Sequence, residues 1–214
     1  MQNKILLSIF IFLVGTTVHA QIKKGAVLLG GGIEFSTQDT KSSGPQNGTS
    51  SGINFSPAFG KAIKENEIIG ADLTFSYSKN ESNNTYSQKT SSYGIGFFIR
   101  KYKELGKGFY LFGQTRAGVS YNKVQNRDQQ TPTTSYVSKG YGMQVTIYPG
   151  LAYAVSKKLQ LEAGLSNLAY IQFNHMQTAY DLNTYPSLTT NNFSLGSSLS
   201  NLAGLTVGFR VLLN

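Results

Sequence analysis

Histidine is the side chain best suited to acid–base chemistry near neutral pH, and this 214-residue chain has only two. His19 falls in an N-terminal segment that we interpret below as a leader, which leaves His175 as the single histidine of the remaining chain. The chain has no cysteine, so a transition-metal site lacks its usual ligands. Asp181 and nearby serines could converge on His175 in space, which keeps a nucleophilic site as the alternative. We predict no catalytic residue, no metal ligand and no cofactor, and interpret His175 as a polar residue at the rim of the fold.

Three consecutive glycines, Gly30-Gly31-Gly32, superficially resemble a phosphate-binding loop. Such a loop opens a helix, and no helical pattern follows these residues. We therefore expect the glycines to lie on a strand, where they relieve crowding or permit curvature.

Six charged residues form the other candidate site. Each stands on the polar side of a segment in which apolar and polar residues alternate, and the three acids balance the three bases. One interpretation is a gate or a narrow ion path. The other is a structural plug of ion pairs that fixes the strand register. We favour the plug because the strands identified below predict an eight-stranded barrel, whose interior is only wide enough for side chains to fill. The six residues are Glu34, Asp72, Glu162, Arg100, Arg116 and Arg210.

The alternation that places these charges predicts β-strands, because successive side chains of a strand leave opposite faces. It is longest in residues 141–166, on both sides of a short turn at 156–158. The second face of that segment is polar and contains glycine and a carboxylate, which suits a tight, wet interior. Beyond the first 20 residues we find no apolar spacing typical of a helix. The eight predicted strands cover 24–37, 51–63, 67–79, 89–101, 108–123, two within 141–166, and 205–213.

The connections between these strands alternate in length. Short turns fall at 64–66, 102–107 and 156–158, and long polar loops at 38–50, 80–88, 124–138 and 176–200. An even number of strands joined in this rhythm is typical of outer-membrane barrels, with short periplasmic turns and longer outer loops. The predicted fold is all-β, an eight-stranded antiparallel up-and-down transmembrane β-barrel. The alternative is a soluble ligand-binding barrel of the lipocalin type, but its inner face is apolar, whereas here the apolar face is nearly uncharged and suits lipid.

The first 20 residues have the features of a cleaved signal peptide. Lys4 supplies a positive charge, residues 5–14 an apolar core, and Val18-His19-Ala20 a small-residue cleavage site. The apolar core is too short to cross a bilayer as a helix, which takes about 20 residues. We expect residues 1–20 to be the signal peptide and residues 21–214 the barrel domain, and no cysteine is present for a lipid anchor.

Basic residues gather near the predicted short turns, where few acids oppose them. They could meet anionic phospholipid headgroups or the cell-wall polymer, or they could be ordinary solvated lysines at the membrane interface. Nucleic acid is a poor partner despite the pI of about 9.6, because the charges are spread over separate turns of an exported chain. The nine residues are Lys23, Lys24, Lys61, Lys64, Lys101, Lys103, Lys107, Lys157 and Lys158.

These features together resemble the small eight-stranded outer-membrane barrels of the OmpA-barrel and OmpX kind. The resemblance covers the mature chain, from Lys23-Lys24-Gly25 through the hairpin at Tyr148-Pro149-Gly150-Leu151 to the last strand. That strand, residues 208–213, is similar to the insertion signal of barrel-assembly substrates, although the chain ends on Asn214 and not on an aromatic residue.

The resemblance implies a location and a set of partners. We expect an outer-membrane protein of Gram-negative bacteria with a structural, adhesion or surface-interaction role in its long outer loops. The alternatives are a narrow porin-like channel, a lipid-modifying enzyme at the rim, or a secreted soluble barrel. The expected partners are outer-membrane lipids and lipopolysaccharide, the barrel-assembly machinery and periplasmic chaperones during biogenesis, and an unknown extracellular ligand. The protein is expected to be a monomer. Barrel enzymes acting on lipid A pair a rim histidine with a serine, and no serine follows His175 at the spacing of a deacylase.

Overall fold

The protein folds entirely into β-structure. The computed structural model describes residues 22–40, 47–82, 86–128, 135–165, 168–181, 185–197 and 205–213. The predicted leader, residues 1–20, lies outside these residues. No helix in the described ranges is long and apolar enough to cross a membrane. The strands are β1 (Val27–Thr40), β2 (Gly48–Lys64), β3 (Glu67–Ser82), β4 (Tyr86–Gly106), β5 (Phe109–Asp128), β6 (Tyr136–Ala154), β7 (Leu159–Leu165), β8 (Ala169–Tyr180), β9 (Leu188–Ser197) and β10 (Leu205–Leu213).

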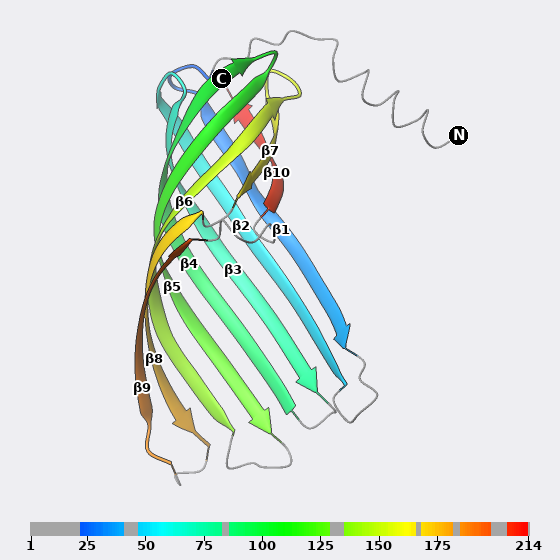
Figure 1. Cartoon of the computed structure of the whole chain (residues 1–214), viewed down its shortest axis with the longest axis vertical. Helices are drawn as coiled ribbons and strands as arrows, with labels where there is room; N and C mark the ends of the chain where they lie inside the picture. Colours follow the sequence, from blue (N-terminus) through cyan, green and yellow to red (C-terminus); the bar gives the residue numbers. More distant parts are fainter. Residues whose placement is uncertain are drawn as a thin grey trace, which may run out of the picture.

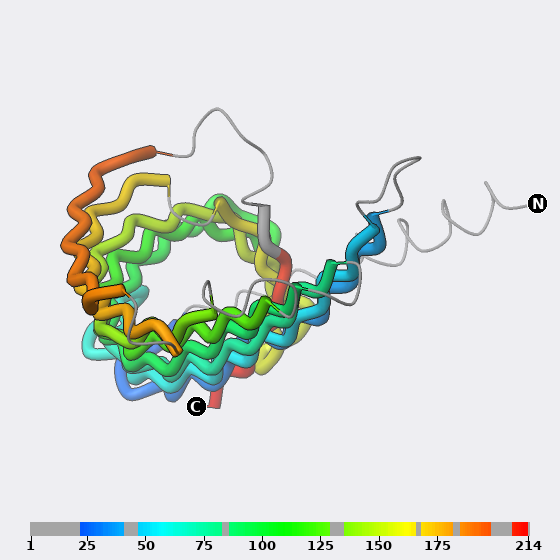
Figure 2. The backbone as a smooth tube through the Cα atoms, turned by 90° about the horizontal axis from the view of Figure 1, so that it is seen from below, coloured from blue at the N-terminus to red at the C-terminus, as the bar shows by residue number. Residues whose placement is uncertain are grey.

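The ten segments occupy eight strand positions in an antiparallel barrel. β7 and β8 both pair with β6, β7 along residues 150–154 and β8 along residues 136–147, so together they fill one strand position. β10 pairs with β7 and β9 with β8, so these two likewise share the last position. The ring closes where β1 pairs with β10. The strands surround a single lumen (Figure 2), and the predicted eight-stranded antiparallel barrel is confirmed.

The two ends of the barrel differ in their connections. The turn end, at the top of Figure 1, holds the tight connections after β2, β4 and β6. The connection between β4 and β5 is the two-residue turn Lys107-Gly108, with φ angles of 51° and 80°, and positive φ at both residues is the hairpin geometry that matches the strand twist. The loop end is opposite, where β1, β3, β5 and β8 end and β2, β4, β6 and β9 begin (Figure 1).

The strands extend further toward the loop end than the sequence predicts. β2 starts at Gly48, β4 at Tyr86 and β6 at Tyr136, each inside a predicted loop. The prediction of one loop over residues 176–200 is wrong, since β8 continues to Tyr180 and β9 lies within that range. Similarly, β4 continues through most of the predicted turn at 102–107. The loop-end segments lack apolar alternation because polar side chains bond across the strands instead, as Ser50 does to Asn80 at 2.6 Å and Ser138 to Thr178 at 2.5 Å.

The outer face of the barrel carries an apolar band. On β3 the outward side chains run from Ile69 to Tyr77 and are exposed. At about 3.3 Å per residue this stretch extends about 27 Å along the strand, and a tilt of about 40° reduces it to about 20 Å of membrane thickness, close to the band of known transmembrane barrels. Tyrosines form its loop-end border, with Tyr93, Tyr121 and Tyr141 directly opposite one another in register. Aromatic borders of this kind mark the membrane interface.

The buried core lies inside the barrel at the turn end. It contains aromatic side chains in mutual contact: the Tyr102 ring centroid is 6.3 Å from that of Tyr110 and 5.8 Å from that of Phe112. The expectation of a wet interior is therefore wrong for the turn end of the lumen, where the buried side chains are mainly apolar. The core residues are Ile22, Ala26, Leu28, Ala62, Ile68, Phe98, Tyr102, Tyr110, Phe112, Ala152, Ala154 and Leu212.

Candidate functional site

The inward charges lie in the lumen on the loop side of the aromatic core, in two separate groups. The first is centred on Glu162 of β7, which is 4% exposed. Its Oε1 pairs with Nη1 of Arg100 and accepts from the Tyr102 hydroxyl at 3.3 Å, and its Oε2 accepts from Nε of Arg210 at 3.1 Å. We call Glu162, Arg100, Tyr102 and Arg210 the Glu162 cluster.

Arg100 connects this cluster to the aromatic core. Its side chain is fully buried, its Nε donates to Gln114 Oε1 at 2.8 Å, and its guanidinium carbon lies 4.4 Å from the centre of the Phe112 ring. A buried guanidinium is stable here because a carboxylate, an amide and a ring face surround it. Two arginines share one glutamate, so the cluster holds one positive charge in excess.

The second group is the pair of Arg116 on β5 and Asp72 on β3. Arg116 Nη2 lies 2.5 Å from Asp72 Oδ1, and its Nε lies 2.8 Å from Oδ2. The two side chains are 21% and 12% exposed, so the pair is less enclosed than the Glu162 cluster. It joins strands that are not neighbours in the sheet and thereby fixes their relative position.

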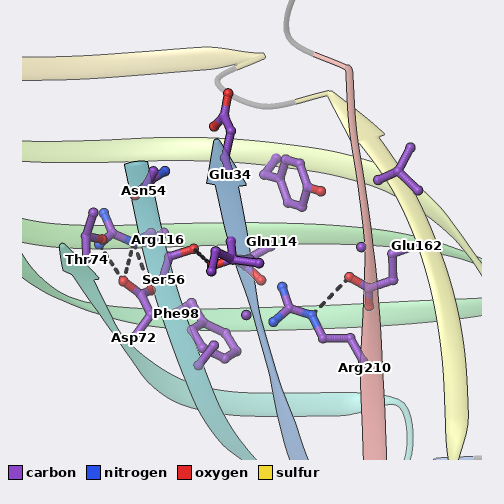
Figure 3. A pocket seen from close by; sticks show the side chains of 17 residues that line it. Glu34, Asn54, Ser56, Asp72, Thr74, Phe98, Gln114, Arg116, Glu162 and Arg210 are labelled. Carbon is purple, nitrogen blue, oxygen red and sulfur yellow. Dashed lines mark hydrogen bonds and ion pairs between the residues drawn. The ribbon is translucent and has the colours of Figure 1, made fainter. Parts of the chain in front are cut away.

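Glu34 of β1 does not join either group. Among the described residues it has no hydrogen bond or ion pair, and Figure 3 shows it apart from the two paired groups. Its cross-strand neighbour on β2 is Asn54, whose buried Oδ1 also lacks a donor. The structure thus brings five of the six predicted lumen charges into ion pairs and leaves Glu34 alone.

Of the six predicted lumen charges, all except Arg100 border one cavity of about 620 Å³. It is lined by inward residues such as Glu34, Asp72 and Arg210, and also by Ile33 and Val207, which belong to the outward set (Figure 3). The cavity therefore reaches the barrel wall, close to the point where the pairing of β1 with β10 ends.

The glycine triplet of β1, Gly30-Gly31-Gly32, explains why the pairing of β1 with β10 ends at this point. A Cβ at Gly30 would overlap the Arg210 side chain that packs across it. Gly31 has φ +146° and lies opposite Pro57, and a Cβ there would approach the carbonyl oxygen of Ser56 to 2.5 Å. Only glycine adopts that backbone region readily. Gly31 is also the last residue of β1 that pairs with β10, so the strand turns away from its partner there.

His175 lies within β8. The sequence analysis instead placed it directly before the predicted loop at 176–200. Its ring stacks on Tyr141 with centroids 5.0 Å apart, and Nδ1 lies 2.8 Å from Oδ1 of Asn191 on β9. Tyr141 is on the exposed outer face. In the described part of the chain, the hydrogen-bond partners of the His175 ring are Asn191 and Gln177, and neither is a serine or a carboxylate.

A second hollow, also of about 620 Å³, lies at the loop end, and the sequence analysis did not find it. Burial raises the pKa of the Tyr86 phenol, and the nearby Tyr136 and Asp128 raise it further. The hollow depends on charges brought together from four strand ends, for which a single sequence offers no spacing signal. Its charged lining residues are Lys79, Lys89, Arg127, Glu81, Asp128 and Asp181. At the other end of the barrel, all nine basic residues singled out in the sequence are exposed.

Comparison with known proteins bears on the fold. No family model matches the sequence, and no curated protein matches it. The outer membrane protein OprG from Pseudomonas aeruginosa superposes on the chain with a TM-score of 0.51, over 91% of this chain and 99% of that one, at 12% identity. The chain has the fold of the small eight-stranded outer-membrane barrels. This agrees with the resemblance seen in the sequence.

Two further structures align less closely. The translocator domain of autotransporter NalP from Neisseria meningitidis gives a TM-score of 0.46 at 19% identity, over 94% of this chain and 70% of that one. Neisserial surface protein A (NspA) gives 0.38 at 15% identity, over 88% and 97%. These weaker likenesses add no argument about function.

Proposed function

We propose that the protein is an integral outer-membrane barrel that acts through its loop end and is not an ion-conducting pore. The observation behind this proposal is the closed turn end of the lumen, where the Glu162 cluster lies directly on a core of buried aromatic rings. Arg100, Tyr110 and Phe112 are each at most 1% exposed. An ion passing through the barrel would have to displace these side chains from a packed layer.

The proposed location rests on three features. The outer face is apolar over a membrane-sized band, bordered by tyrosines. The fold is similar to that of an outer-membrane protein. The first 20 residues have the composition of a secretory leader. Together they favour the outer membrane over the secreted soluble barrel, whose outward side chains would be polar.

The loop end offers the surface for a structural, adhesion or surface-interaction role. The loop-end hollow combines three basic and three acidic side chains, a mixed lining that suits a polar partner outside the cell. A role as a lipid-modifying enzyme is less well supported, because His175 bonds to an asparagine and stacks on a tyrosine. We therefore propose a non-enzymatic protein.

Single-channel recording of the refolded mature protein in a planar bilayer tests the proposal. A heat-modifiable gel shift first establishes that the barrel has folded. We expect a folded, inserted and electrically silent protein, and we expect Phe112→Ala to introduce leakage by opening the aromatic layer. Steady conductance steps from the unmodified protein that change on substituting Glu34, Asp72 or Arg116 would refute the closed lumen and favour the narrow channel.

A further inference from the structure

The seam between the first and last strands is incomplete. β1 pairs with β10 over five residues, Val27–Gly31 with Phe209–Leu213. Beyond Gly31 the described part of β1 pairs only with β2, and β9 pairs only with β8. β1 and β9 diverge toward the loop end in both views of the backbone (Figures 1 and 2).

Several of the most exposed large apolar side chains lie beside this seam. Val207 is 76% exposed, Phe35 72% and Ile33 62%, compared with 42% for Leu73 within the paired wall. Ile33 and Val207 both border the lumen cavity, so the cavity reaches the apolar band at this seam. A molecule entering there would come from the lipid, whereas entry along the barrel axis from the turn end is blocked by the aromatic core.

Two charges in this cavity lack a balancing partner, and they have opposite signs. Glu34 has no partner in the described residues, and the buried amide oxygen of Asn54 opposite it also lacks a donor. The Glu162 cluster has one positive charge in excess, and Nη1 of Arg210 has no acceptor. The Asp72–Arg116 pair, which also borders the cavity, is neutral. Glu34 is exposed, so its carboxylate can be reached by a cation in the cavity, and the excess positive charge of the Glu162 cluster favours an anion near Arg210.

We propose that the cavity binds a zwitterionic, single-chain amphiphile from the membrane. Its ammonium group lies at Glu34 and Asn54, its anionic group lies toward Arg210, and its acyl chain leaves the cavity between Ile33 and Val207. A cavity of about 620 Å³ is within the range of small-molecule sites. This inference rests on the membrane location proposed above, and it describes binding without passage through the lumen.

Equilibrium binding tests the proposal on the full-length mature protein, refolded in maltoside micelles. The probe is lysophosphatidylethanolamine with a labelled acyl chain, and the competitor is lysophosphatidylglycerol, which has the same phosphate but no ammonium. We expect the wild-type protein to prefer the zwitterion by about tenfold, as one charge-assisted hydrogen-bonded contact allows. Glu34→Gln keeps the side-chain shape and should abolish the preference. Glu81→Gln, at a loop-end carboxylate paired with Lys79 at 2.7 Å, should leave it unchanged.

A second pair of variants tests whether the acyl chain leaves the cavity beside Ile33. Ile33→Trp adds bulk at the mouth of the cavity and should weaken binding, whereas Ile69→Trp adds the same bulk on the paired wall of β3 and should not. Equal affinity of the wild-type protein for both lipids, or an unchanged preference in Glu34→Gln, would overturn the inference. If the inference fails in this way but the same preparation inserts and stays electrically silent, the proposed function still holds. Conductance steps together with a preference for the zwitterion would refute the closed lumen and retain the site.

Discussion

Replacing Glu162 with glutamine should destabilise the barrel more than any other change of a single charge in the lumen. Glu162 is the only carboxylate that contacts Arg100 and Arg210 in the described structure. With glutamine there, both arginines keep their positions and lose their counter-charge, and Arg100 has no access to water. Removing one partner of a buried ion pair costs about 3–5 kcal/mol, because the remaining charge stays desolvated. We expect a loss of about that size in the free energy of unfolding.

Urea unfolding in lipid vesicles measures this loss, followed by far-UV circular dichroism and by the fraction that migrates as folded in an unboiled gel. Glu67→Gln is the matched control, because Glu67 pairs with the exposed Lys101 at 3.9 Å and should change stability by less than about 1 kcal/mol. The double variant Arg100→Met/Glu162→Gln removes the most buried cation as well and should recover part of the loss. A loss for Glu162→Gln no larger than that of Glu67→Gln would mean that the cluster is hydrated, and the closed lumen would fail with it.

Three other substitutions probe different parts of the wall. Arg116→Ala leaves Asp72 without its bidentate partner, and because that pair is partly exposed we expect a loss of about 2–3 kcal/mol in the same urea assay. Gly31→Ala should lower the free energy of unfolding by about 1–3 kcal/mol, because its φ is +146°. Gly113→Ala is the control and should change it by no more than about 0.5 kcal/mol, because the space around a Cβ there is open. Equal effects of the two substitutions would contradict backbone strain at Gly31. Leu73→Arg on the lipid face should cost about 2–4 kcal/mol in vesicles, and a neutral effect would argue against its membrane contact.

The fold could be predicted because one physical rule operates along the whole wall. Between lipid and lumen, side chains must alternate, and the alternation in Ile69–Tyr77 or Tyr141–Leu151 predicts long strands with one apolar face. The rule loses force where both faces of a strand meet water. β9, with the sequence LTTNNFSLGS, is exposed along nearly its whole length, and its alternation is too weak to separate it from a loop.

The lumen was predictable in content but not in arrangement. Parity along each strand assigns Glu34, Arg100 and Glu162 to the inside, but their height along the barrel depends on strand stagger, which a single sequence does not specify. That stagger places Glu162 between two arginines and leaves Glu34 without one. The apolar layer was missed because its members, such as Tyr110 and Phe112, occupy inward positions in only a short part of each strand.

The seam also has a consequence for the order of folding. It joins strands from opposite ends of the chain, so its closure has the largest sequence separation of any contact in the barrel, and it gains only five residue pairs in return. The other neighbouring strands form hairpins, except β6 with β8 and β7 with β10, which span far shorter stretches of the chain. Contacts between distant segments form slowly because their loop-closure entropy must be overcome before they give any stabilisation. We expect the sheet from β2 to β6 to assemble first and the meeting of β1 with β10 to limit the rate. The same five pairs should then be the first to separate when the barrel unfolds.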